Sequence, residues 1–298
     1  MKNIIPGTLK ADLLLLLTAL IWGSAFVAQR AGMDHMGPFI YNGIRFGLGA
    51  VTLIPLMWYR HKKNITDPVF QEKGSAYLLK AGLITGVLLF LGSSLQQVGI
   101  VYTTAGKAGF ITGLYVVIVP VLGLVWKQRP GAGVWIGAVL AVAGLYLLTI
   151  SDDLMIEFGD FLVLLCAAAF ALHVLAIGWL VARVDCVKLA AAQFAVTSLL
   201  SLAVASVFEE VLLSSLINGI IPILYGGIMS AGIAYTLQIV AQRQAPPAHA
   251  AIILSLESVF AVLAGWIILS EILGGREIAG CLLMFAGMLC AQLYPLKK

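Results

Sequence analysis

Two charged side chains lie deep inside long apolar segments of this chain, and their types define the chemistry available there. Glu257 is about ten residues into the segment 248–269, and Arg45 is about seven residues into the segment 38–59. At a helical rise of ~1.5 Å per residue, these positions lie ~15 Å and ~10 Å from the segment ends. A buried carboxyl group can bind a proton or a cation, whereas a guanidinium group suits a carboxylate.

Each of these charges also has a purely structural explanation. A charge at the centre of a membrane helix costs about 2.5–3.5 kcal/mol, so such groups face the protein interior or water. Glu257 is either a protonated acid bonded to a neighbouring helix or a group that lines a pathway and binds a proton. Arg45 is a substrate countercharge, a partner of a helix carbonyl, or a side chain that extends outwards to the membrane interface.

Other polar and aromatic residues in the apolar segments are candidates to line a binding cavity. Lys107 and His249 occupy equivalent positions of an internal repeat and could frame a cavity from opposite sides, although snorkelling to the interface also explains both. His173 could relay protons, but a lone histidine on an apolar helix is more often a packing element. Aromatic faces and amide groups that together suit a small amphipathic ligand are supplied by Trp22, Tyr41, Tyr115, Gln96, Gln97, Tyr235 and Gln238. Each single member could equally be an interface anchor or form an interhelical bond.

The composition indicates that these residues lie in membrane-spanning helices. Hydrophobic residues make up 61% of the 298 residues, charged residues make up only 11%, and the mean hydropathy is +1.03. Soluble domains carry about a quarter charged residues. Apolar runs near the ~20 residues that cross a bilayer predict ten helices, at 11–29, 38–59, 77–98, 104–126, 133–150, 159–181, 188–208, 215–240, 248–269 and 277–295.

The predicted spans form two copies of one unit. Residues 94–130 align with residues 236–272 at a constant offset. Because each copy has an odd number of spans, the second copy enters the membrane from the opposite side. We therefore predict an all-α integral membrane protein with a five-helix repeat at 1–152 and an inverted one at 153–298. Inverted repeats are typical of transporters that alternate access to a site near the midplane. Pro120, within the fourth span, is a candidate hinge or a tolerated bend.

The basic residues predict the orientation. With a cytoplasmic N-terminus, 14 of the 18 Lys and Arg residues fall on the cytoplasmic side, and the outer loops keep only Arg30 and Arg276. The positive-inside rule then places both termini and the loop 60–75 in the cytoplasm and the loop 151–158 outside, in a bacterial inner membrane. The net charge of +4 comes from this asymmetry of the loops, so it does not argue for a nucleic acid partner.

The sequence gives no support for catalysis. HExxH, G-x-S-x-G, Ser-x-x-Lys and P-loop motifs are absent, and the hydrophilic loops are too short for a catalytic or nucleotide-binding domain. The cysteines suggest no disulfide or metal cluster, because Cys166, Cys281 and Cys290 fall in spans and Cys186 falls in a short loop. We therefore expect no enzymatic activity, no metal and no cofactor. An intramembrane enzyme and a non-transporting scaffold are the alternatives from other classes.

Several segments resemble the EamA-type branch of the drug/metabolite transporter superfamily. These are LTALIWGSAFVAQR, GIRFGLGA and the helix pairs 104–150 and 248–295, so the resemblance covers essentially the whole chain. It implies ten helices around a central cavity, and export, less often import, of amino acids and similar small metabolites. The sequence departs from the family at Ser258, because the family commonly has proline at the position after Glu257. The superfamily also includes proton-coupled multidrug carriers, which usually have their essential acidic residue within the first helix. In this chain the first span has only Asp12, which lies at its cytoplasmic edge, so the resemblance favours a metabolite carrier.

These features together predict a secondary transporter that exports amino acids or related solutes by alternating access. Its expected partners are a small solute and the lipid bilayer, with proton coupling and a homodimer left open. Proton-coupled multidrug efflux is the alternative function. The identity of the substrate, the coupling ion and the net direction do not follow from the sequence.

Overall fold

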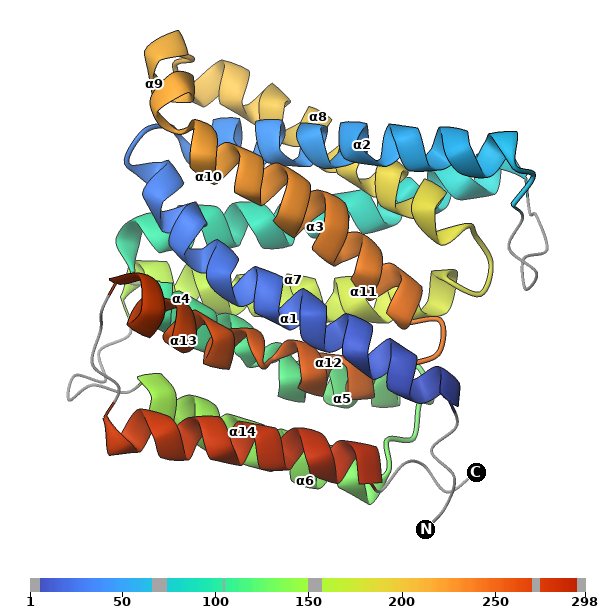
Figure 1. Cartoon of the computed structure of the whole chain (residues 1–298), viewed down its shortest axis with the longest axis vertical. Helices are drawn as coiled ribbons and strands as arrows, with labels where there is room; N and C mark the ends of the chain where they lie inside the picture. Colours follow the sequence, from blue (N-terminus) through green and yellow to red (C-terminus); the bar gives the residue numbers. More distant parts are fainter. Residues whose placement is uncertain (1–5, 66–73, 104, 150–156, 270–273, 294–298) are drawn as a thin grey trace.

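The computed structural model describes residues 6–65, 74–103, 105–149, 157–269 and 274–293, and it contains no strand among them (Figure 1). The helices of the first half are α1 (Pro6–Met33), α2 (Pro38–Lys62), α3 (Ser75–Tyr102), α4 (Ala105–Gly113), α5 (Tyr115–Val125) and α6 (Ala132–Thr149). The second half begins with α7 (Phe158–Leu180), α8 (Cys186–Phe208), α9 (Leu213–Asn218), α10 (Ile220–Leu224) and the π-helix η1 (Tyr225–Tyr235). It ends with α11 (Thr236–Ala241), α12 (Pro247–Leu254), α13 (Glu257–Leu269) and α14 (Gly275–Leu293).

The all-helical prediction is confirmed, and most of the predicted spans have counterparts of sufficient length. Eight segments of the described chain are long and apolar enough to cross a membrane. The difference from the ten predicted spans lies at α6 and α14, whose apolar parts, Ala132–Leu147 and Ile278–Ala291, are shorter. Apolar runs become helices because a bilayer offers no partner to backbone N–H and C=O groups, which must therefore bond within the segment.

Most helix contacts join an element of the first half to one of the second half. α2 packs against α8 and η1, α3 against α7 and α8, and α1 against α12, α13 and η1. The pair α6 and α14 lies together along one side of the molecule (Figure 1). This pair approaches closely because Gly137 and Gly287 meet there: a Cβ added to either would lie 2.7 Å from the carbonyl oxygen of the other.

Two spans that correspond in the repeat are each interrupted near the middle. Leu114 separates α4 from α5, and Ser255–Leu256 separates α12 from α13. The chain makes a tighter turn at each point; for example, the Leu114 N–H donates to the carbonyl oxygen of Ile111 over 3.2 Å. The offset of the repeat aligns Leu114 with Leu256, so the two interruptions are equivalent. The second one forms although Ser258 replaces the proline that is common in the family.

The predicted span 215–240 is not a regular α-helix. It comprises α10, the 11-residue π-helix η1 and α11, after the short helix α9. π-Helical turns are rare and occur frequently at functional sites. Gly226 and Gly227 allow η1 to lie against α2, because an added Cβ would meet the Tyr41 hydroxyl at 2.5 Å and the Leu48 Cβ at 2.7 Å.

Polar contacts join the two halves at both ends of the bundle. At the end where α1 begins and α2 ends (Figure 1), Arg60 binds both carboxylate oxygens of Asp185, at 2.9 and 3.3 Å. Asp185 also caps α8 by accepting the backbone N–H groups of Val187 and Lys188. At the opposite end, the Glu209 carboxylate accepts two backbone N–H groups at the start of α2, over 3.0 and 2.7 Å.

Candidate functional site

A cavity lies between the two halves, with about 480 Å³ of empty space that includes the part open to solvent. Eight of the twelve residues proposed from the sequence line this cavity: Trp22, Arg45, Gln96, Tyr115, His173, Tyr235, Gln238 and Glu257. The other lining residues are Phe26, Gln29, Thr112, Phe170, Val174, Ser230 and Leu254. The lining therefore combines aromatic rings, amide groups and two ionisable groups of opposite charge, a mixture that is typical of small-molecule sites.

Glu257 is the first residue of α13, directly after the second helix interruption, and only 4% of it is exposed. An acid in this position is favoured by the positive end of the helix dipole. The Tyr115 hydroxyl and the Glu257 carboxyl group interact with each other, but Glu257 Oε1 and Tyr115 Oη are both buried without a partner at hydrogen-bond distance. Buried polar atoms are normally paired, so these two atoms are available to a ligand.

Arg45 lies on α2 and is 2% exposed. Its guanidinium carbon lies 4.8 Å from the ring centroid of Phe46 and 5.3 Å from that of Tyr41, so aromatic faces stabilise the charge. Its Nε atom is buried without a hydrogen-bond partner, and no carboxylate among the described residues forms an ion pair with it. A buried guanidinium group without an acidic partner can accept an anionic ligand.

Tyr235, at the end of η1, is the centre of the aromatic part of the cavity. Its ring centroid lies 4.5 Å from that of Trp22 and 6.1 Å from that of His173, and it also contacts the rings of Phe46 and Phe194. Its hydroxyl group interacts electrostatically with both Arg45 and Glu257. Tyr235 therefore shares the cavity lining with both charged groups and lies within electrostatic range of each.

The polar side chains of the lining are held by hydrogen bonds to neighbouring residues of the protein. His173 Nε2 lies 3.0 Å from Oε1 of Gln193, the residue that the repeat aligns with Arg45. Because an amide oxygen only accepts, this contact makes Nε2 of His173 the protonated nitrogen. Gln96 donates to Thr112 Oγ1 over 3.2 Å, and Trp22 Nε1 donates to the carbonyl oxygen of Ser230 over 3.3 Å. These bonds fix the orientation of the lining groups before any ligand binds.

Four of the predicted site residues are not part of the described lining. Gln97 is fully buried, and its side-chain amide donates to the carbonyl oxygen of Gln29 over 3.3 Å. Tyr41 is fully buried behind the cavity wall, and its hydroxyl donates to the carbonyl oxygen of Pro222 over 3.1 Å. His249 lies at the end of the bundle where α1 begins, and its Nε2 is 2.7 Å from Oδ1 of Asp12. This contact is neither snorkelling nor a contact with the cavity, because it joins α12 to α1. Lys107 belongs to α4, but its side chain lies outside the described residues.

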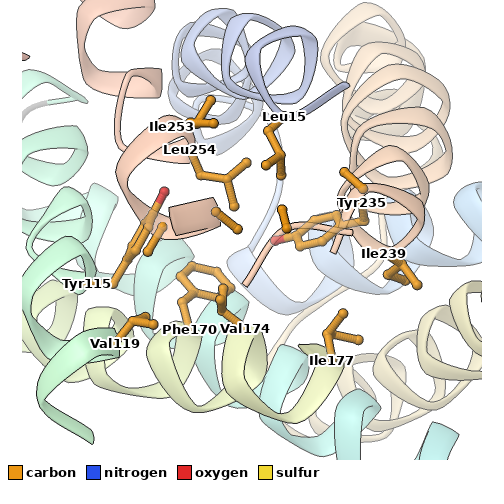
Figure 2. Close-up of a cluster of buried hydrophobic side chains, with 14 of the residues drawn as sticks. Leu15, Tyr115, Val119, Phe170, Val174, Ile177, Tyr235, Ile239, Ile253 and Leu254 are labelled. Atoms are coloured by element: carbon orange, nitrogen blue, oxygen red, sulfur yellow. The ribbon is translucent and has the colours of Figure 1, made fainter. Parts of the chain in front are cut away.

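Apolar side chains fill the space between the cavity and the end of the bundle that holds Asp12 and His249. Figure 2 shows Leu15 of α1, Ile177 of α7, Ile239 of α11 and Ile253 of α12 in one buried apolar cluster. All four are 0% exposed. Because such a layer excludes water and ions, a solute cannot leave through this end unless the helices move apart.

Comparison with known proteins identifies the family. The model of the EamA-like transporter family matches residues 9–150 and again residues 157–292. The chain belongs to the EamA-like transporter family. Because the same model matches once in each half, the internal duplication is also apparent from the family match.

Relatives of this EamA-like transporter occur in archaea and bacteria. An uncharacterized transporter of Archaeoglobus fulgidus is 33% identical over 96% of this chain and 86% of its own length. The uncharacterized transporter YoaV of Bacillus subtilis is 23% identical over 90% of this chain and 92% of its own length. A solved crystal structure superposes with a TM-score of 0.75 over 95% of this chain and 96% of the other, at 17% identity, and so shows the same fold. The chain is therefore a multi-pass membrane transporter.

Some lining residues of this EamA-like transporter were missed in the sequence. Trp22, Phe26 and Gln29 are spaced by four and three residues, so they share one face of α1, and Trp22 alone was proposed. Extending the proposal along that face would have found the other two. Thr112 and Ser230 give no such signal, because a single small hydroxyl residue in an apolar helix is common.

Proposed function

We propose that this protein exports amino acids or related small solutes by secondary, alternating-access transport. The observation that carries the proposal is a cavity in which buried Arg45 and Glu257 both have unpartnered polar atoms, with the Tyr235 ring in the same lining. An amino acid has one carboxylate and one ammonium group, which these two side chains complement. Binding the solute would supply each charge with the partner that it lacks.

The architecture proposed for this function is ten transmembrane helices in two inverted repeats, at 1–152 and 153–298. The double family match and the equivalent interruptions at Leu114 and Ser255–Leu256 support it. Alternating access requires two states that close opposite ends of the cavity. The apolar layer at one end supports a state that is closed on that side, and the repeat supplies the symmetry for a state closed on the other.

The oligomeric state, a possible homodimer, stays a prediction.

Proton-coupled multidrug efflux is the second candidate function. A buried acid, Glu257, in a cavity with aromatic lining would suit a cationic, apolar drug. A flux experiment separates the candidates. Purified protein in sealed vesicles should exchange labelled amino acids across the membrane, and multidrug efflux predicts movement of cationic drugs instead. A scaffold or an enzyme would move neither, and that result would reject transport.

We also propose that the protein lies in a bacterial inner membrane with both termini and the loop 60–75 in the cytoplasm. The asymmetry of Lys and Arg residues supports this orientation. Alkaline phosphatase folds only outside the cytoplasm, so a fusion after Asp153 should be active and a fusion after Lys63 inactive. The reverse pattern of activities would overturn the orientation.

A further inference from the structure

We infer that Tyr115 and Glu257 together form a binding site for a monovalent cation, at the point where the two interrupted helices meet. The offset that aligns 94–130 with 236–272 places Tyr115 on Glu257, so the two residues are equivalents in the repeat. Tyr115 is the first residue of α5, and Glu257 is the first residue of α13. The duplication therefore brings one oxygen-bearing side chain from each half to the same place.

The two side chains lack the partners that buried groups normally have. Tyr115 is 3% exposed and Glu257 is 4% exposed. Tyr115 and Glu257 line the same cavity and interact with each other, and neither Tyr115 Oη nor Glu257 Oε1 has a partner at hydrogen-bond distance. Both are oxygen atoms, the ligand type that hard cations prefer. The Thr112 hydroxyl, three residues before Tyr115, lines the same cavity and adds a further oxygen.

The charges around the site also favour a cation. No basic residue among the described ones forms an ion pair with Glu257; the recorded ion pairs of described residues are Arg60 with Asp185 and His249 with Asp12. An ionised Glu257 carboxylate would be compensated only by the positive end of α13, and a buried charge without an ionic partner is costly. The C-terminal ends of α4 and α12, which carry partial negative charge, lie at the same interruptions as the positive ends of α5 and α13. Half-helix ends of this kind coordinate cations in other transporters with broken helices.

The site connects elements that belong to different ends of the bundle. α4 packs against α13, and the Ser258 hydroxyl donates to the carbonyl oxygen of Gly109 over 2.9 Å between them. α5 packs against α12. Glu257 therefore belongs to one pair of half-helices and Tyr115 to the other, so a cation held between them links the two pairs.

The cation can come from two sources with the same chemistry, a free alkali-metal ion or the primary ammonium group of a solute. The second source rests on the proposed function, whereas the first does not. The full-length protein in lipid nanodiscs would be unfolded by heat in NaCl, KCl or ethylammonium chloride, each replacing choline chloride at constant ionic strength and pH. The melting temperature should rise saturably with a small cation, because a ligand that binds only the folded state stabilises it.

Variants assign this effect to the two residues. Glu257→Gln should remove the cation-dependent shift, and Glu257→Asp, which moves the charge, should weaken it. Tyr115→Phe should raise the apparent dissociation constant about 10- to 100-fold, the loss expected when one interaction with a charged group is removed. Tyr146→Phe removes a hydroxyl from an exposed position outside the cavity, and it should keep the wild-type shift.

The outcomes separate the sources and can reject the site. A shift with Na⁺ or K⁺ assigns a free ion, and a shift with ethylammonium alone assigns the ammonium group of a solute. The proposal is overturned if no small cation exceeds choline, or if Tyr115→Phe binds as tightly as the wild type. Solute flux without a cation shift would leave transport standing and reject this site. A cation shift without solute flux would keep the site and reject the proposed function.

Discussion

A Glu257→Gln variant is expected to lose solute accumulation driven by a pH gradient while it still exchanges solute across vesicles at equilibrium. The amide keeps the shape of the side chain at the start of α13 but cannot take up and release a proton. If one proton moves per solute, a gradient of one pH unit can sustain about tenfold accumulation. The variant should therefore fall from about tenfold to no accumulation, whereas it still exchanges solute at equilibrium, with a lower apparent affinity because the amide offers no charge to the ammonium group.

The measurement is uptake of labelled solute into vesicles with and without an imposed pH gradient, together with counterflow in its absence. Glu210→Gln is the matched control, because it removes a carboxylate from an exposed position outside the cavity. The control should accumulate solute as the wild type does. Full uphill transport by the Glu257 variant would show that Glu257 does not carry the coupling, and would leave this residue with a packing role.

The helices of this protein could be predicted because their cause is local. A long apolar run in a bilayer satisfies its backbone N–H and C=O groups by forming a helix, and the apolar runs of this chain are helical from α1 to α14. The interruptions could not be predicted, because they have no local cause of the same strength. Pro120, the residue most likely to bend a helix by itself, lies inside α5, whereas the chain breaks at Leu114 and at Ser255–Leu256. These breaks depend on how the half-helices pack against each other.

The charged residues of the candidate site could be predicted from the sequence, because burying a charge costs free energy. Arg45 and Glu257 stood out because a charge inside an apolar helix needs a reason, and both line the cavity. Aromatic residues carry no such cost, so their place depends on the rotation of each helix about its axis. Tyr41 and Tyr235 were proposed together, but only Tyr235 lines the cavity, because η1 directs it inward while Tyr41 packs behind Arg45. The π-helical winding of η1 that sets this rotation has no clear signature in the sequence.

An Arg45→Gln variant is expected to transport carboxylate-bearing solutes far less well than neutral analogues. Glutamine is the residue that the repeat aligns with Arg45, at position 193, so the substitution suits the helix environment. A guanidinium group binds a carboxylate through two parallel, charge-assisted hydrogen bonds. Losing such bonds costs roughly 1.5–3 kcal/mol, which corresponds to an apparent affinity about 10- to 100-fold lower. Arg45→Lys keeps the positive charge but loses the planar guanidinium group that donates two parallel hydrogen bonds, so it should lower the apparent affinity by an intermediate amount.

The test compares an amino acid with its amide or ester in the same vesicles. Arg60→Gln is the matched control, because Arg60 lies on the same helix but pairs with Asp185 at the end of the bundle. This control should affect both solutes equally, since it changes no group in the cavity. If Arg45→Gln also weakens both solutes equally, Arg45 stabilises the helix packing through its contacts with Tyr41 and Phe46. A loss confined to the carboxylate solute would identify Arg45 as the countercharge, because only a direct contact distinguishes two solutes that differ in that one group.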